Sequence, residues 1–140
     1  MDNRYKINDA EIINETIDGE VMLLNLTNGN YFSLDNVGVL IWEIITQKYP
    51  VEALIKSITS YDVNSKGIME TSIQKVVSQM LEEGLIVHCD DDKNPLDQVS
   101  YINEVLSKLK EGTIRYEIPV LHMYKDIQEK YAHPCGVKTI

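Results

Sequence analysis

The sequence predicts an α+β fold: an N-terminal three-stranded antiparallel meander, then three helices, then a C-terminal helical and extended appendage. Two turn dipeptides, Asp18-Gly19 and Asn28-Gly29, separate short apolar segments. Such pairs favour tight hairpins, because Asp, Asn and Gly tolerate positive φ. After residue 35 the apolar residues recur at spacings of three and four, which indicates amphipathic helices.

The three predicted strands cover residues 10–17, 20–26 and 31–34. Both faces of the second strand are largely apolar, so we expect it to be the middle one. Hairpin connections then give the strand order one-two-three. This order leaves the strand over residues 31–34 with a free edge.

The first predicted helix covers residues 36–49, and Asp35 before it is a residue type that favours the N-cap position. Gly38 in its first turn costs up to about 1 kcal/mol relative to Ala. A glycine here fits a close approach of the helix to the sheet.

The second and third predicted helices cover residues 50–61 and 68–83. Gly84 is placed to end the third helix in a left-handed conformation. Residues 85–87 then pack back on the core or form a short extra strand. This order of strands and helices is winged-helix-like.

We predict a domain over residues 1–87, an acidic linker over 88–98, and an appendage over 99–140 made of a helix and an extended tail. The appendage helix is amphipathic, and the tail from residue 113 contains two prolines. Apolar residues share one side of the appendage helix: Ile102, Val105, Leu106 and Leu109.

The charge balance argues against nucleic acid as a partner. The chain of 140 residues has 13 Lys and Arg against 22 Asp and Glu, a formal net charge of −9. Phosphate binding needs clustered basic residues, which are absent from the sequence. No apolar run approaches the roughly 20 residues of a membrane helix, and the N-terminus lacks a secretory apolar segment. We therefore predict no membrane partner and a cytoplasmic location.

No catalytic motif is present, so we predict a protein that is not an enzyme, with no catalytic residues, no cofactor and no metal. A zinc site built from His88, Cys89, His133 and Cys135 is an alternative, but these residues lack the usual ligand spacing. The acidic run at 90–92 could bind a cation through oxygen ligands, although a solvated loop is the simpler interpretation.

The segment at 31–34, Tyr-Phe-Ser-Leu, carries neither charge nor proline, the usual protections of an edge strand. It is expected beside the third helix, which can present apolar residues. An edge strand next to an apolar helix forms a groove that suits an extended peptide bound by strand addition.

Two segments, DGEVMLLNLTNGNYFSLDNVGVLIWEII and VVSQMLEEGLIV, carry a family resemblance. Together they resemble the PqqD-like family of pyrroloquinoline quinone biosynthesis, whose small winged-helix-like domains are precursor-peptide recognition elements. The resemblance covers residues 11–87. It rests on a shared pattern at Tyr31, Leu34, Asp35, Gly38, Ile41, Trp42, Leu81, Gly84, Leu85 and Ile86.

The resemblance implies a non-enzymatic chaperone that binds the leader of a ribosomally made precursor peptide. The leader adds as a strand and is presented to a modifying enzyme, such as a radical S-adenosylmethionine (SAM) protein. Carried onto this chain, the resemblance implies backbone pairing by Asn30, Tyr31, Phe32 and Ser33. It also implies side-chain contacts from Ile73, Val77, Met80 and Leu81.

The tail from residue 113 departs from the bare family domain. Its stretch YEIPVLHMYKDIQE is similar to a short proline-containing segment at the ends of small proteins and peptides in such biosynthetic clusters. We hypothesise that the tail docks on the groove as a pseudo-leader, in cis or on a neighbouring subunit. A disordered tail, or one docked on a partner enzyme, is the alternative.

Two other functions fit the predicted fold. A winged-helix DNA-binding regulator would use the third helix for recognition, but Glu70, Glu82 and Glu83 outnumber Lys75 there. A structural homodimer could instead form through the edge strand or the tail.

Overall fold

The computed structural model describes residues 4–89 and 95–124. Along the chain the strands are β1 (Tyr5–Ile7), β2 (Ile12–Ile17), β3 (Glu20–Asn25), β4 (Tyr31–Leu34), β5 (Ile86–His88) and β6 (His122–Tyr124). The helices are α1 (Val37–Thr46), α2 (Val51–Tyr61), the 3₁₀ turn η1 (Val63–Ser65), α3 (Lys66–Glu82) and α4 (Pro95–Glu111). The predicted α+β class is therefore confirmed.

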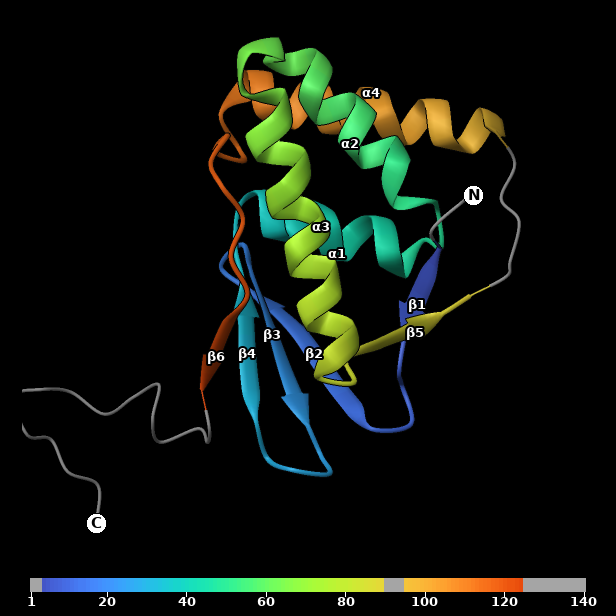
Figure 1. Ribbon diagram of the computed structural model, residues 1–140, viewed down its shortest axis with the longest axis vertical. Helices are drawn as coiled ribbons and strands as arrows, with labels where there is room; N and C mark the ends of the chain where they lie inside the picture. The colour runs from blue at the N-terminus through green and yellow to red at the C-terminus, as the bar shows by residue number, and fades with distance from the viewer. Residues whose placement is uncertain (1–3, 90–94, 125–140) are drawn as a thin grey trace, which may run out of the picture.

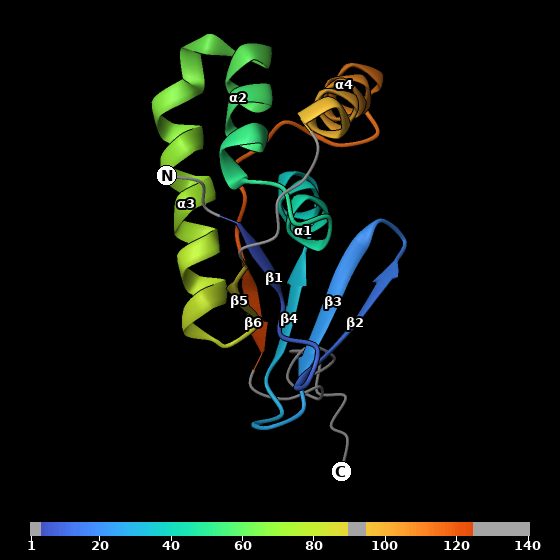
Figure 2. The same cartoon turned by 90° about the vertical axis from the view of Figure 1, so that its right-hand side faces the viewer.

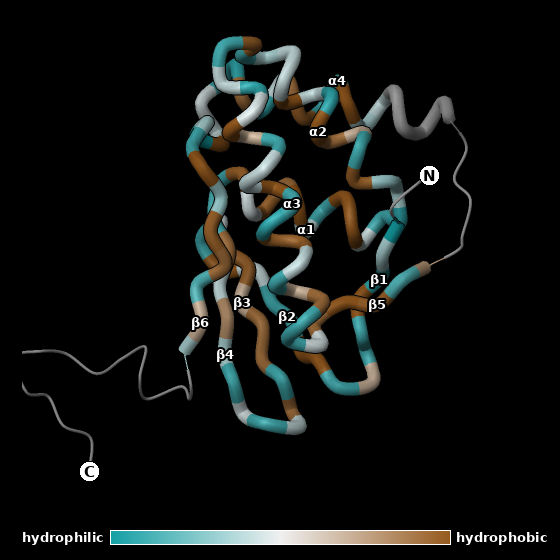
Figure 3. Tube along the Cα trace, in the orientation of Figure 1, coloured by the Kyte–Doolittle hydropathy of each residue, from teal (hydrophilic) through white to brown (hydrophobic). Residues whose placement is uncertain are grey.

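The main sheet is antiparallel and has four strands, in the order β2-β3-β4-β6 (Figure 1). The β2–β3 turn has positive φ at both Asp18 (52°) and Gly19 (78°), as the dipeptide predicted. β3 lies in the interior of the sheet and is lined with hydrophobic residues (Figure 3). The predicted strand number of three was wrong, because β6 from the tail pairs with β4. The edge of β4 that the sequence left free is therefore occupied by the same chain.

A second, two-stranded sheet joins the two ends of the predicted core domain. β1 pairs antiparallel with β5, with Tyr5 opposite His88. The extra strand after the third helix thus forms, which was one of two alternatives. Gly84 ends α3 with a φ of 74°, and its carbonyl accepts a hydrogen bond from the Asn8 side chain at 2.9 Å.

The helices lie against one face of the main sheet and extend beyond its end (Figures 1 and 2). α1 contacts β3 and β4 directly, and it also packs on α2 and α3. α2 contacts both α3 and α4. α1 therefore forms the central layer between the sheet and the outer helices.

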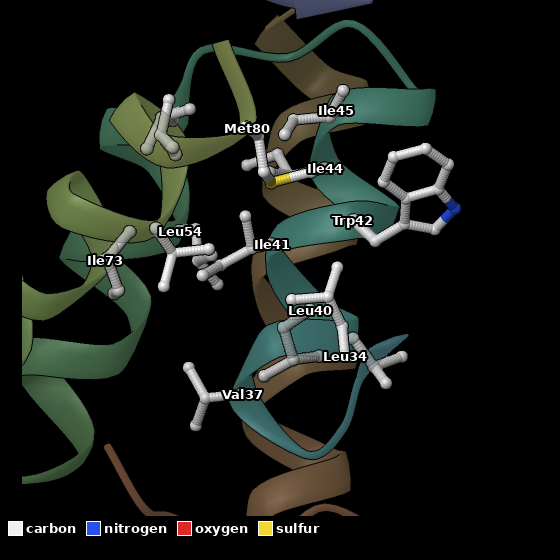
Figure 4. Packing of buried hydrophobic residues seen from close by; sticks show 14 of the residues in the cluster. Leu34, Val37, Leu40, Ile41, Trp42, Ile44, Ile45, Leu54, Ile73 and Met80 are labelled. Atoms are coloured by element: carbon white, nitrogen blue, oxygen red, sulfur yellow. The ribbon is translucent and has the colours of Figure 1, made fainter. Parts of the chain in front are cut away.

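The core lies where α1, α2 and α3 meet above the sheet (Figure 4). Its largest fully buried side chains come from two strands and three helices. They are Leu23, Phe32, Leu34, Leu40, Ile41, Ile44, Ile45, Leu54, Ile58, Met69, Ile73 and Met80.

The start of α1 approaches the end of β4 closely. A Cβ atom built on Gly38 would lie 3.0 Å from Leu34 Cδ2 and 3.2 Å from Leu34 Cβ. The glycine therefore allows the close approach that the sequence suggested. The predicted N-cap was wrong by one residue: Asn36 occupies it, with a φ of 47° and no side-chain capping bond.

α4 packs on the same core as the preceding helices. Tyr101, Val105 and Leu109 are buried in it, and the Tyr101 hydroxyl donates a hydrogen bond to the Leu40 carbonyl at 3.0 Å. A Lys108–Glu43 ion pair at 3.2 Å links α4 to α1 at the surface. None of the helices in the described part of the chain combines the length and apolar character that crossing a membrane requires.

Candidate functional site

The outer edge of β4 is the first wall of the candidate site. β6 pairs with it in antiparallel register, with Tyr31 opposite Tyr124, Phe32 opposite Met123 and Ser33 opposite His122. The pairing joins segments about ninety residues apart in the sequence. This edge can therefore bind an extended segment from elsewhere.

α3 forms the second wall. The tail passes beside α3 before it joins β4 (Figures 1 and 2). A hollow of about 150 Å³ lies between α3 and the tail, and both segments supply its lining. The lining residues are Ser72, Lys75, Val76, Gln79, Ile118, Pro119 and Val120. We call the β4 edge at residues 31–34, together with the α3 face formed by Ser72, Lys75, Val76 and Gln79, the β4–α3 groove.

The tail segment that leads into the groove is packed against the rest of the protein at its first residues. Ile114 is buried in the core. The Tyr116 ring lies 5.1 Å from the Tyr61 ring, and its hydroxyl is hydrogen-bonded to Ser65 Oγ. The later residues Ile118 and Val120 are about half exposed. Pro119 between them is buried, and Leu121 packs partly buried against the core, so burial alternates along the segment towards β6.

Asn36 connects the start of α1 to the tail. Its Oδ1 accepts a hydrogen bond from the Arg115 backbone N–H at 3.0 Å, and its Nδ2 donates one to Glu117 Oε1 at 2.9 Å. Asn tolerates the positive φ of this position better than most residues. The side chain of the α1 N-cap therefore binds the tail and does not cap its own helix.

The four predicted backbone residues lie at β4 or next to it. Asn30 precedes the strand, and its carbonyl accepts a hydrogen bond from the Asn25 N–H at 2.9 Å. Tyr31, Phe32 and Ser33 all lie in the β4–β6 pairing. The Phe32 side chain is fully buried in the core, so only its backbone faces the groove.

The four predicted α3 side chains lie mainly in the core. Ile73 and Met80 are fully buried, and Leu81 is partly buried against the core. Val77 lines a different hollow, on the side of α3 that faces β1 and α2. The α3 residues beside the tail are spaced at i, i+3, i+4 and i+7: Ser72, Lys75, Val76 and Gln79. None of these four was among the predicted site residues; three of them are polar, and the prediction followed apolar side chains.

The hollow beside Val77 is larger, at about 260 Å³, and is lined by Tyr5, Glu52 and Gln74 among others. Burial raises the pKa of Tyr5, and the nearby Glu52 carboxylate raises it further. Six of its seven lining residues come from α2 and α3 and only Tyr5 comes from a strand, whereas β4 pairs with an extended segment over three residues. We therefore place the candidate site at the β4–α3 groove.

Metal chemistry finds no support in the described residues. No group of three or more His, Cys, Asp or Glu side chains is gathered there. His133 and Cys135, which the zinc alternative needs, and the acidic run at 90–92 lie outside the described residues.

The fold and the groove together define a class: a small winged-helix-like α+β domain in which β4, beside α3, pairs with an extended segment. Residues 20–86 match the family model described as coenzyme PQQ synthesis protein D (PqqD). This match supports a PqqD-like assignment for residues 20–86, so the predicted resemblance is confirmed. Neither the search of curated proteins nor that of solved structures returned a match.

The PqqD family consists of non-catalytic accessory proteins that bind peptide and partner enzymes in PQQ biosynthesis. The matched region runs from β3 to the start of β5 and contains both walls of the β4–α3 groove. It does not include α4 or β6. The groove therefore belongs to the family domain, whereas the strand that occupies it does not.

Proposed function

We propose that this protein is a non-enzymatic peptide chaperone. In this proposal the β4–α3 groove captures the leader of a ribosomally made precursor peptide by strand addition. The bound leader is then presented to a modifying enzyme, such as a radical SAM protein. The match to the PqqD family model supports the general role in peptide binding.

The observation that carries the proposal is the pairing of β4 with β6. An edge that accepts a remote segment of its own chain has main-chain donors and acceptors in the right geometry for a guest strand. The guest leader is proposed to take the same antiparallel place.

The α3 wall is proposed to contribute side-chain contacts. Val76 offers apolar surface, while Ser72 and Gln79 offer hydrogen-bonding groups and Lys75 a positive charge. Lys75 suits a leader with an acidic residue facing α3, because opposite charges attract across a groove. Strand addition draws affinity from the backbone and specificity from such alternate side-chain positions.

The four apolar α3 residues predicted from the sequence have a structural role in this proposal. Ile73, Val77, Met80 and Leu81 pack towards the core. They are proposed to fix the position of α3 relative to β4 and so to set the width of the groove. Contact between the leader and these four residues remains a prediction.

Nuclear magnetic resonance can test the location of binding. Candidate leader peptides are titrated into the labelled protein while backbone amide signals are followed. We expect shifts at Tyr31, Phe32 and Ser33 and at the α3 residues of the groove, which are Ser72, Lys75, Val76 and Gln79. Gln74 and Ser78, on the other side of α3, serve as the internal control. Shifts confined to that other side would contradict the proposed site.

The DNA-binding alternative is tested separately. The tail lies along the α3 face that contains Ser72, Lys75 and Gln79. A recognition helix needs an exposed basic face to enter the major groove. A gel shift at low salt should therefore show no retardation of duplex DNA. Retardation at micromolar protein would favour the regulator instead.

A further inference from the structure

The tail occupies the groove that the proposed function assigns to a leader. We infer that residues 114–124 form an intramolecular latch, and that a peptide binds in trans by displacing it. This inference rests on the proposed function, because it concerns regulation of the same groove. Beyond the proposed function, we assign the groove a second ligand, which is a segment of the same chain, and we assign Asn36 the role of holding that segment.

The latch contacts both walls of the groove. Its β6 residues pair with β4, and its residues 118–120 lie against α3. Both the main-chain ladder and the α3 face are therefore engaged. A second strand cannot pair with the same β4 edge while β6 is in place.

The latch is anchored by Asn36 at its start and by a short strand at its end. Ile114 is buried, and Asn36 holds the backbone of Arg115 and the carboxylate of Glu117. β6 itself has three residues, and the Met123 side chain is 47% exposed. Short, exposed edge pairing opens at a small fraction of the global unfolding free energy. Exchange with a peptide should therefore begin at β6.

Because the latch belongs to the same chain as the groove, it competes strongly with a free peptide for the β4 edge. A tethered segment acts at an effective concentration of about millimolar. The observed affinity of a peptide in trans falls by the fraction of molecules whose groove is open. A groove open in about one tenth of molecules weakens peptide binding about tenfold.

Two kinds of substitution loosen the latch without touching the groove walls. Successive strand residues point their N–H groups to opposite sides, so one of His122 and Met123 directs its N–H at β4. Replacing both with proline removes that donor. Asn36→Gly removes the two amide hydrogen bonds and keeps a residue that accepts positive φ. No capping bond is lost, because the Asn36 side chain makes none.

The test measures the affinity of a fluorescent peptide with the sequence of residues 114–124 for four full-length proteins. These are the parent, Asn36→Gly, the triple variant Asn36→Gly/His122→Pro/Met123→Pro, and the matched control His122→Ala/Met123→Ala. We expect the triple variant to bind the peptide at least about tenfold more tightly than the parent. The alanine pair keeps both N–H groups and should stay within about threefold of the parent.

Thermal unfolding of each variant verifies that it is folded. If the triple variant does not fold, the Asn36→Gly variant alone tests the latch. We expect it to bind the peptide about threefold more tightly than the parent. Equal affinity across all folded variants would overturn the latch but leave the proposed function standing. Absence of binding to every folded variant would also overturn the latch, and the titration with candidate leader peptides decides the proposed function separately. A concentration-dependent dimer whose tails are exchanged would overturn the intramolecular assignment.

Discussion

The rings of Tyr31 and Tyr124 lie 5.8 Å apart and are tilted by 44° across the pairing of β4 with β6. Aromatic cross-strand pairs contribute about 0.5–1.5 kcal/mol beyond their buried area. A double-mutant cycle with Tyr31→Ala and Tyr124→Ala should give a coupling free energy in this range, measured by urea unfolding. Met123→Ala in place of Tyr124→Ala is the control, and its coupling to Tyr31 should be below about 0.5 kcal/mol. A coupling near zero for the tyrosine pair would show that β6 does not lie on β4 in solution.

Gly38 gives a prediction about the approach of α1 to the sheet. An alanine Cβ there would lie 3.0 Å from Leu34 Cδ2, in a fully buried environment. We expect Gly38→Ala to lower the free energy of unfolding by about 1–3 kcal/mol through overpacking. Gly67 in α3 is the matched control, because nothing lies within 4 Å of a Cβ at that position.

Gly67→Ala should raise the stability by about 0.5–1 kcal/mol, as alanine is the better helix former. Chemical denaturation of both variants measures the difference. The same sign for the two changes would contradict the close packing of Gly38 against Leu34.

Local turn chemistry made much of the fold predictable. Asp18-Gly19 and Gly84 need no partner to favour positive φ, and both take it. The apolar spacing of residues 37–45 likewise places α1 on the core. These features depend on short stretches of chain, so a single sequence contains most of their physical cause.

The site was less predictable because it depends on contacts between distant segments. β6 is a three-residue strand whose pairing with β4 exists only in the folded chain. The sequence suggested that the tail docks on the groove in cis or on a neighbouring subunit, and the part of the tail that the structure describes pairs with β4 of its own chain. Ser72 and Gln79 are polar, so the spacing of apolar residues did not point to them. The role of Asn36 depends on a contact with Arg115, which is 79 residues away in the sequence.

Tyr101 gives a prediction about pH. Burial raises its pKa well above 10.0, and the nearby carboxylates of Glu43 and Glu104 raise it further. The folded state therefore keeps the phenol protonated where the unfolded chain ionises. Its contribution to stability is fully present below pH 10 and is lost as the pH rises from there towards the folded-state pKa.

Thermal and urea unfolding between pH 8 and pH 11 measure this effect. Tyr101→Phe should be less stable than the parent at pH 8 by about 0.5–1.5 kcal/mol, because it loses the hydrogen bond to Leu40. Above pH 10 the difference in unfolding free energy between the parent and Tyr101→Phe should become smaller, by at most about 1.4 kcal/mol per pH unit for one group. A gap that stays constant up to pH 11 would show that Tyr101 ionises equally in both states.

Ser33 separates main-chain from side-chain recognition in the groove. Among the described residues its Oγ is the buried side-chain polar atom without a hydrogen-bond partner. Ser33→Ala removes a desolvated hydroxyl and leaves the β4 backbone unchanged. We expect the free energy of unfolding to be unchanged or to rise by up to about 2 kcal/mol, measured by chemical denaturation. Peptide affinity should stay within about twofold of the parent, because strand addition uses the Ser33 backbone. A loss of affinity above tenfold would instead place the hydroxyl in direct contact with the guest peptide.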